Sequence, residues 1–102
     1  MANIAVLGYG TVGSGVVEVL NTNKDRINSK SYEPINIKYV LDLRDFPGDP
    51  VQEIITHDYN DILNDNTIDV VVEVMGGINP AYTFVKQALE SGKSVCTSNK
   101  EL

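Results

Sequence analysis

The chain has 102 residues, which suits one domain rather than two. Its net charge is −6, and its 8 lysines and arginines are scattered instead of clustered, so a nucleic acid is not an expected partner. The N-terminal residues carry neither a basic stretch nor an apolar run long enough for a signal peptide or a membrane segment. We therefore expect a cytoplasmic protein without a membrane partner.

Short apolar strands alternate with helices along the chain. Strands are expected at residues 3–7, 35–43, 52–56, 69–75 and 94–97. Helices are expected at residues 11–20, 58–64 and 80–91. This alternation, with strands that are apolar on both faces, is typical of a parallel sheet covered by helices on both sides.

The helices carry start and stop signals and one apolar face each. Asp58 is expected to cap the second helix, and Asn79 the third, with Pro80 at its first position and Gly92 just past its end. The apolar faces are expected to bury two sets of side chains. They are Val12, Val16, Val17 and Leu20 in the first helix, and Tyr82, Val85, Ala88 and Leu89 in the third.

A glycine motif lies between the first strand and the first helix. Residues 8–13 fit the pattern G-x-G-x-x-G. In this context Gly8 allows a tight turn, Gly10 lets the backbone approach a pyrophosphate, and Gly13 lets the helix pack against the strand. The N–H groups at the helix start, at Thr11 and Val12, would then face the phosphates. The alternative is a strand–helix turn that merely uses glycine; the context favours a Rossmann-type, doubly wound α/β domain that binds a dinucleotide.

The end of the second strand offers two residues that bear on the cofactor. A Rossmann domain places an acidic residue there for the ribose hydroxyls, and Asp42 is the candidate for NAD. Arg44 would instead meet the 2′-phosphate of NADP. Either residue could also be a solvated charge at a strand end, so NAD and NADP both remain open.

The segments after the fourth and fifth strands are expected at the ligand edge of the sheet. Gly76 and Gly77 would let the cofactor lie close to the backbone. The segment that contains Thr97, Ser98, Asn99 and Lys100 places a hydroxyl, an amide and an ammonium at the same edge. A lysine beside a nicotinamide can hydrogen-bond a reacting oxygen or relay a proton, which makes Lys100 the candidate catalytic residue; the alternative is an exposed terminal lysine. We predict no metal site.

Four other residues are interpreted as structural. Cys96 is the single cysteine, which excludes an intrachain disulfide, and it is expected to be a small buried hydrophobe rather than a reactive thiol. Gly15 is expected to allow close packing of the helix against the sheet. Glu73 lies in an apolar strand, so either that strand is partly open or the carboxylate has a polar partner. His57 is expected at the surface or at a helix cap.

Three segments together resemble homoserine dehydrogenase. They are residues 8–17 (GYGTVGSGVV), residues 70–81 (VVVEVMGG…PA) and residues 97–102 (TSNKEL). The resemblance implies interconversion of L-homoserine and L-aspartate 4-semialdehyde with NAD or NADP. It also implies that residues 8–13 bind the pyrophosphate and that Thr97 and Lys100 lie beside the cofactor, with Lys100 close to the reacting oxygen. Ser98 stands where the family usually has alanine.

The chain is much shorter than members of this family. The resemblance implies that the substrate domain, the sheet that forms the homodimer and a second lysine all follow the segment seen here. Residues 1–102 are therefore expected to form the NAD(P)-binding domain, with affinity for the dinucleotide but without turnover of homoserine. We also expect that an uncovered edge at the fifth strand could lead to self-association.

Two other functions fit the glycine motif and the element order. One is a different two-domain reductase, of the aspartate dehydrogenase or glucose–fructose oxidoreductase kind. The other is a nucleotide-sensing module that stands alone. The EVMGG and NKEL segments favour homoserine dehydrogenase over the other reductases. A natural reading frame that continues for several hundred residues past Leu102 would exclude the stand-alone module.

Overall fold

Five parallel strands form one sheet in the computed structural model, which describes residues 2–22, 35–75 and 80–98. The strands are β1 (Ala2–Leu7), β2 (Ile35–Leu41), β3 (Ile55–Thr56), β4 (Ile68–Glu73) and β5 (Ser94–Thr97). Their order across the sheet is β3-β2-β1-β4-β5, and each neighbouring pair is parallel. The helices are α1 (Thr11–Thr22), α3 (Asn60–Leu63) and α4 (Ala81–Glu90), together with the 3₁₀ helix η1 (Pro50–Ile54). The predicted doubly wound α/β fold is confirmed.

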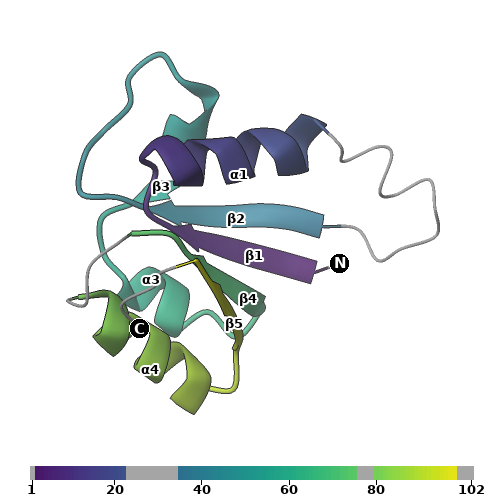
Figure 1. The fold of residues 1–102 in the computed structure, drawn as a ribbon, viewed down its shortest axis with the longest axis vertical. Coiled ribbons are helices and arrows are strands. Elements are labelled where there is room, and N and C mark those ends of the chain that lie inside the picture. The colour runs from purple at the N-terminus through teal and green to yellow at the C-terminus, as the bar shows by residue number, and fades with distance from the viewer. Residues whose placement is uncertain (1, 23–34, 76–79, 99–102) are drawn as a thin grey trace.

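Helices cover both faces of the sheet, with α1 on one side and α3 and α4 together on the other (Figure 1). The side chains of β1 alternate between the two layers, as the pleat of a strand requires. Ile4 and Val6 pack with Val17 of α1, whereas Ala5 and Leu7 pack with Ile62 of α3. The strands are therefore apolar on both faces because each face has its own core.

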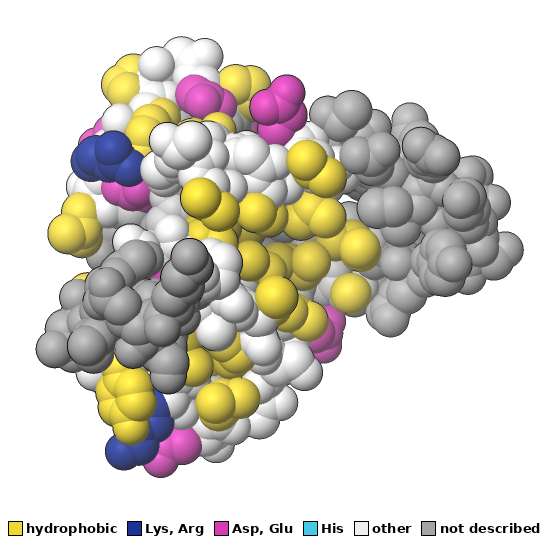
Figure 2. Space-filling model, in the orientation of Figure 1, with side chains coloured by type: hydrophobic (Ala, Val, Ile, Leu, Met, Phe, Trp, Pro, Cys, Tyr) yellow, Lys and Arg dark blue, Asp and Glu magenta, His cyan; other side chains and the backbone are white. Residues whose placement is uncertain are grey.

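The α1 side of the sheet is covered less completely than the other side. Ile37 of β2, and Val70 and Val72 of β4, pack against the core on this side but remain half-buried. Figure 2 shows hydrophobic side chains gathered on the visible face of the sheet, between α1 and the lower helices. None of the helices in the described part of the chain is both long and apolar enough to cross a membrane.

The register of the strands brings their carboxyl ends into one row. Leu7, at the end of β1, pairs with Leu41 of β2 on one side and with Glu73 of β4 on the other. Glu73 in turn pairs with Thr97, at the end of β5. In an open parallel sheet this edge is where ligands bind, and β1 is the point at which the chain order reverses.

Four predicted strand ranges need correction, the smallest change being that β1 begins at Ala2 instead of residue 3. β2 ends at Leu41 instead of residue 43, because the Asp42 side chain accepts the N–H groups of Tyr9 and Arg44 and turns the chain away. β4 runs from 68 to 73 rather than from 69 to 75. Most of the strand expected at 52–56 is the 3₁₀ helix η1, because the Asp49 carboxylate accepts the Val51 N–H and caps it, leaving a strand of two residues.

The predicted helix faces were partly wrong. Val12 in α1, and Tyr82 and Leu89 in α4, are each more than half exposed. Because α4 meets the sheet through Ala81 and Ala88, which are one heptad apart and fully buried, the stripe one residue further on faces solvent.

The predicted helix ends were closer to the structure. Gly92 follows α4 with a φ of +90°, as a glycine past a helix end should. Pro80 precedes α4 instead of occupying its first position, and Asn79 lies outside the described residues. α3 covers only Asn60–Leu63, although the Asp58 carboxylate accepts the Asn60 N–H as a cap would.

Cys96 is exposed, which contradicts the prediction of a buried thiol. It lies in β5, the last strand of the order β3-β2-β1-β4-β5, and only Val95 of that strand packs against a core. An apolar sequence around a cysteine therefore did not imply burial, because burial depends on what covers the strand.

Candidate functional site

The three glycines of residues 8–13 have three different surroundings. Gly8 has a φ of +102°, which L side chains rarely adopt, and its N–H donates to the Leu41 carbonyl at 2.8 Å. A methyl group at Gly13 would overlap the Gly8 carbonyl oxygen, so the helix is held directly against the turn. A methyl group at Gly10 would meet no atom within 4 Å. The turn therefore has no room for a side chain at Gly8 or Gly13, but it leaves free space at Gly10, where the sequence predicts the pyrophosphate.

The start of α1 faces the same open space. Thr11 and Val12 are exposed, and the Ser14 N–H donates to the Gly10 carbonyl at 2.8 Å to begin the helical ladder. The N–H groups ahead of that bond lack helical acceptors and carry the positive end of the helix dipole. Gly15 does not pack closely against the sheet as predicted, because a methyl group there would also meet no atom within 4 Å.

A cavity of about 560 Å³ lies beside this turn, within the size range of small-molecule sites. The ends of four strands and the start of α4 contribute to its wall. The lining residues are Gly8, Tyr9, Gly10, Leu41, Asp42, Leu43, Arg44, His57, Tyr59, Val74, Met75, Pro80 and Phe84. The structure therefore brings Gly8, Gly10, Asp42 and Arg44, four of the residues expected to bind the cofactor, to one cavity.

Asp42 and Arg44 are paired with each other at this cavity. The Arg44 Nε lies 3.0 Å from Asp42 Oδ1, and its Nη2 lies 2.9 Å from Oδ2. The Tyr9 N–H also donates to Asp42 Oδ2, at 3.0 Å. Hydrogen bonds from the Arg44 side chain lower the pKa of the Asp42 carboxyl to about 2. The Asp42 side chain is 10% exposed and the Arg44 side chain 63%, so the carboxylate is anchored while the guanidinium lies at the surface.

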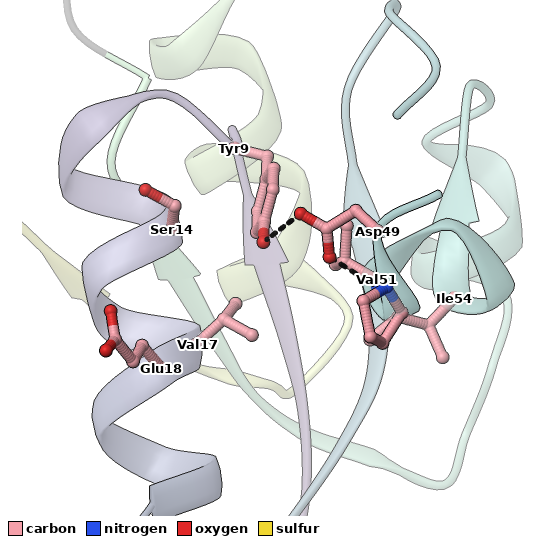
Figure 3. A pocket seen from close by; sticks show the side chains of 8 residues that line it. Tyr9, Ser14, Val17, Glu18, Asp49, Val51 and Ile54 are labelled. Atoms are coloured by element: carbon pink, nitrogen blue, oxygen red, sulfur yellow. Dashed lines mark hydrogen bonds between the residues drawn. The ribbon is translucent and has the colours of Figure 1, made fainter. Parts of the chain in front are cut away.

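Tyr9 connects the glycine turn to the loop after β2. Its ring meets Phe46 edge-on, with the ring centroids 4.8 Å apart, and its hydroxyl donates to Asp49 Oδ2 at 3.2 Å (Figure 3). The Arg44 guanidinium lies 5.2 Å from the centroid of the same Phe46 ring. These contacts hold the loop that carries Asp42 and Arg44 against the glycine turn.

The far wall of the cavity holds residues that the sequence did not single out as a site. Tyr59 stacks on Phe84 with the centroids 4.1 Å apart, and its hydroxyl donates to the Phe84 carbonyl at 2.6 Å. Burial raises the pKa of the Tyr59 hydroxyl to about 12. His57 is exposed, as predicted, and its Nε2 lies 2.9 Å from Asp45 Oδ1. Aromatic residues far apart in the chain gave no local signal that they would share this wall.

Glu73 has the polar partners that a buried carboxylate requires. It is fully buried, and its Oε2 accepts the Met75 N–H at 2.6 Å while its Oε1 accepts the Thr97 hydroxyl at 2.7 Å. The Ser98 N–H donates to the Glu73 carbonyl at 3.3 Å. Thr97 and Ser98 thus lie at the predicted edge, whereas Gly76, Gly77 and Lys100 lie outside the described residues.

A family model described as the NAD-binding domain of homoserine dehydrogenase matches residues 8–102. The chain belongs to this family. The homoserine dehydrogenase of Bacillus subtilis is 37% identical over 103 residues, a match that covers 97% of this chain and 24% of that protein. This membership favours homoserine dehydrogenase over the other reductases considered from the sequence.

Solved structures of the family share the fold. A crystal structure of homoserine dehydrogenase from Staphylococcus aureus superposes with a TM-score of 0.90 at 42% identity, covering 99% of this chain and 26% of that one. A homoserine dehydrogenase from Thiobacillus denitrificans gives a TM-score of 0.83 at 33% identity, with coverage of 99% and 24%. The chain therefore spans about a quarter of the length of the relatives it matches.

A nicotinamide dinucleotide fits the residues that the structure describes. The space at Gly10 admits a phosphate close to the backbone, and the cavity extends from there past Asp42 on one side and Met75 on the other. As an NAD-binding domain, the chain binds a cofactor of this class.

Proposed function

We propose that residues 1–102 bind NAD in an enzyme that interconverts L-homoserine and L-aspartate 4-semialdehyde. The observation that carries the proposal is the glycine turn at the end of β1. It is packed tightly at Gly13, leaves free space at Gly10, and lies beside the Asp42 carboxylate, which accepts the Tyr9 N–H. When bound, the nicotinamide cofactor supplies the acceptor or donor of the hydride. The chain's own residues bind and orient it.

The pyrophosphate is proposed to bind to backbone groups. The N–H groups of Thr11 and Val12 would donate to its oxygens, aided by the positive end of the α1 dipole. This binding needs no lysine or arginine side chain. It explains how a chain with a net charge of −6 could hold an anionic cofactor.

Asp42 favours NAD over NADP in this proposal. Its carboxylate can accept the ribose 2′-hydroxyl of NAD, whereas a 2′-phosphate would bring like charges together. Arg44 could offset that repulsion, but its Nε and Nη2 already donate to Asp42. Because Tyr9 and Arg44 both anchor the carboxylate, it is not free to swing away from a phosphate.

The nicotinamide is proposed to lie over the ends of β4 and β5. If the adenosine ribose meets Asp42 at β2 and the pyrophosphate meets β1, the other half of the dinucleotide extends toward β4 and β5. Gly76 and Gly77 would line that half, with Thr97 and Ser98 beside it. Lys100 would lie close to the reacting oxygen, where it could hold or relay a proton.

We propose that turnover of homoserine also needs the parts of the relatives' chains that residues 1–102 do not match. The chain covers 24% of the Bacillus subtilis relative, so the groups that bind homoserine and the surfaces that form a homodimer would lie in the remaining parts. Residues 1–102 by themselves should then bind the cofactor without oxidising homoserine.

A chimera tests this function. This chain would replace the matching quarter of the Staphylococcus aureus enzyme, and homoserine-dependent formation of NADH would be followed at 340 nm. We expect turnover by the chimera, none by the isolated chain, and a large loss in the chimera with Lys100→Ala while NAD still binds. Oxidation of homoserine by the isolated chain, or a folded chimera that binds NAD but is inactive, would contradict the proposal.

A further inference from the structure

Glu73 is a carboxylate placed where the fold calls for an apolar side chain. It is the last residue of β4, fully buried, and lies in register between Leu7 and Thr97. Strands with helices on both faces are normally continuous apolar runs, and burying a carboxyl group is costly unless its oxygens find donors. The stability of the sheet does not explain a glutamate here, because a valine or leucine would pack without that cost.

The two oxygens of Glu73 join the exits of two neighbouring strands. Oε2 accepts the backbone N–H of Met75, on the segment that leaves β4. Oε1 accepts the hydroxyl of Thr97, at the end of β5. Neither partner is a cation, so the side chain works as a bridge of hydrogen bonds between two strand ends, with Glu73 and Thr97 24 residues apart in the chain.

The Met75 end of this bridge reaches the glycine turn. Met75 lines the 560 Å³ cavity, and its Cγ lies so close to Gly8 that a methyl group there would be 3.0 Å away. On the proposed function, Met75 lies between the pyrophosphate at the glycine turn and the nicotinamide half over the ends of β4 and β5. The position of Met75 therefore limits where the nicotinamide can lie.

We propose that Glu73 is a positioning residue for the nicotinamide half of the cofactor, acting through Met75 and Thr97. The inference rests on the proposed function and assigns different residues to the two halves of the cofactor. Asp42 holds the adenosine half, and Glu73 fixes the geometry of the other half without touching the cofactor. Loss of the bridge should then weaken the binding of NADH and spare ligands that lack a nicotinamide.

Three variants of Glu73 separate this role from a general structural one. Glu73→Met removes both acceptors but keeps an apolar side chain of similar length in a buried strand. Glu73→Asp keeps the carboxylate but is one methylene too short to reach both partners. Glu73→Gln keeps the length, and its amide can accept from Met75 and donate to Thr97. Ser94→Ala, at the exposed start of β5, is the matched control.

The measurement is calorimetric titration of each variant with NADH and with ADP-ribose, which has no nicotinamide. Displacement of the Met75 and Thr97 segments should cost the cofactor contacts worth about one hydrogen bond, so we expect Glu73→Met and Glu73→Asp to weaken NADH binding about tenfold. ADP-ribose binding should change by less than about twofold, and Glu73→Gln should recover most of the NADH affinity. Ser94→Ala should match the wild type with both ligands.

The outcomes separate this inference from the proposed function. Suppose that the wild-type chain binds both ligands. The inference alone would then be overturned if Glu73→Met and Glu73→Asp bind NADH with unchanged affinity, or if they lose affinity for both ligands equally. A folded wild-type chain that binds neither ligand would overturn the proposed function and the inference with it. If Glu73→Met does not fold, the comparison of Glu73→Asp with Glu73→Gln still decides the matter.

Discussion

Gly13 lies directly against Gly8, so that any side chain at position 13 would overlap the Gly8 carbonyl oxygen. Gly10 and Gly15, on either side of Gly13 in the chain, would each accept a methyl group without meeting an atom within 4 Å. Three glycines within six residues therefore have different tasks. Gly13 allows the fold, Gly10 leaves room for a ligand, and no packing contact in the structure accounts for Gly15.

Alanine at positions 13 and 15 should have opposite effects on stability. Gly13→Ala forces the helix off the turn and should lower the free energy of unfolding by about 2 kcal/mol or more. Gly15→Ala adds a helix-favouring residue in open space and should raise it by up to about 1 kcal/mol. Urea unfolding followed by circular dichroism measures both. Equal stability of the two variants would show that the turn relaxes to admit a side chain.

Alanine at position 10 should affect binding without affecting the fold. Its methyl group meets no protein atom but would project into the space assigned to the pyrophosphate. We expect an urea midpoint within error of the wild type and a loss of NADH affinity of about tenfold or more. Gly15→Ala is the control for binding and should keep the wild-type affinity. Unchanged NADH binding by Gly10→Ala would place the pyrophosphate elsewhere.

Removal of the Asp42 charge should shift the choice of cofactor toward NADP. Asp42→Asn keeps the size of the side chain but removes the repulsion of a 2′-phosphate and releases Arg44 to meet it. The ratio of NADPH to NADH dissociation constants should fall about tenfold or more. Because the pKa of Asp42 is about 2, the carboxylate itself stays ionised from pH 6 to 9, and its own titration should not change the wild-type preference over that range. Parallel titrations with both cofactors test this; an unchanged ratio would remove Asp42 from the specificity site.

Tyr59 should make stability fall at high pH. Its pKa is raised from 10.0 to about 12 in the folded chain, so the unfolded chain releases the proton first and unfolding is favoured as the pH rises through this window. Tyr59→Phe loses the hydrogen bond to the Phe84 carbonyl and should cost about 1 kcal/mol at pH 7. The stability of this variant should also fall less at high pH, because the hydroxyl whose ionisation favours unfolding is absent. Denaturant curves at pH 7 and at several values from 9.5 to 11.5 compare the two, and a constant difference between them would contradict the burial of the hydroxyl.

Sequence patterns predicted those features of the fold that are determined by residues close together in the chain. The order of strands and helices, the turn at Gly8 and the helix end at Gly92 follow from conformations that glycine and apolar runs favour locally. Exposure could not be predicted in the same way. Tyr82 and Cys96 lie in segments with apolar residues, yet both are exposed, because burial depends on which side of a helix meets the sheet and on what covers a strand.

The site was also only partly predictable. The sequence indicated Asp42 and Arg44 as alternatives, each suited to a different cofactor, but it did not indicate that they bind each other. Glu73 was recognisable as a carboxylate in need of a partner. Its partner Thr97 lies on the neighbouring strand, and only the register of β4 with β5 identifies it.

The central claim is that these 102 residues bind a nicotinamide dinucleotide at the glycine turn. Calorimetric titration of the purified, folded chain with NADH and with NADPH tests it most directly. We predict saturable binding of one NADH per chain, tighter than that of NADPH, and a marked loss of affinity in Gly10→Ala. A folded wild-type chain that binds neither cofactor would contradict the account. So would a Gly10→Ala variant that binds both cofactors as tightly as the wild type does.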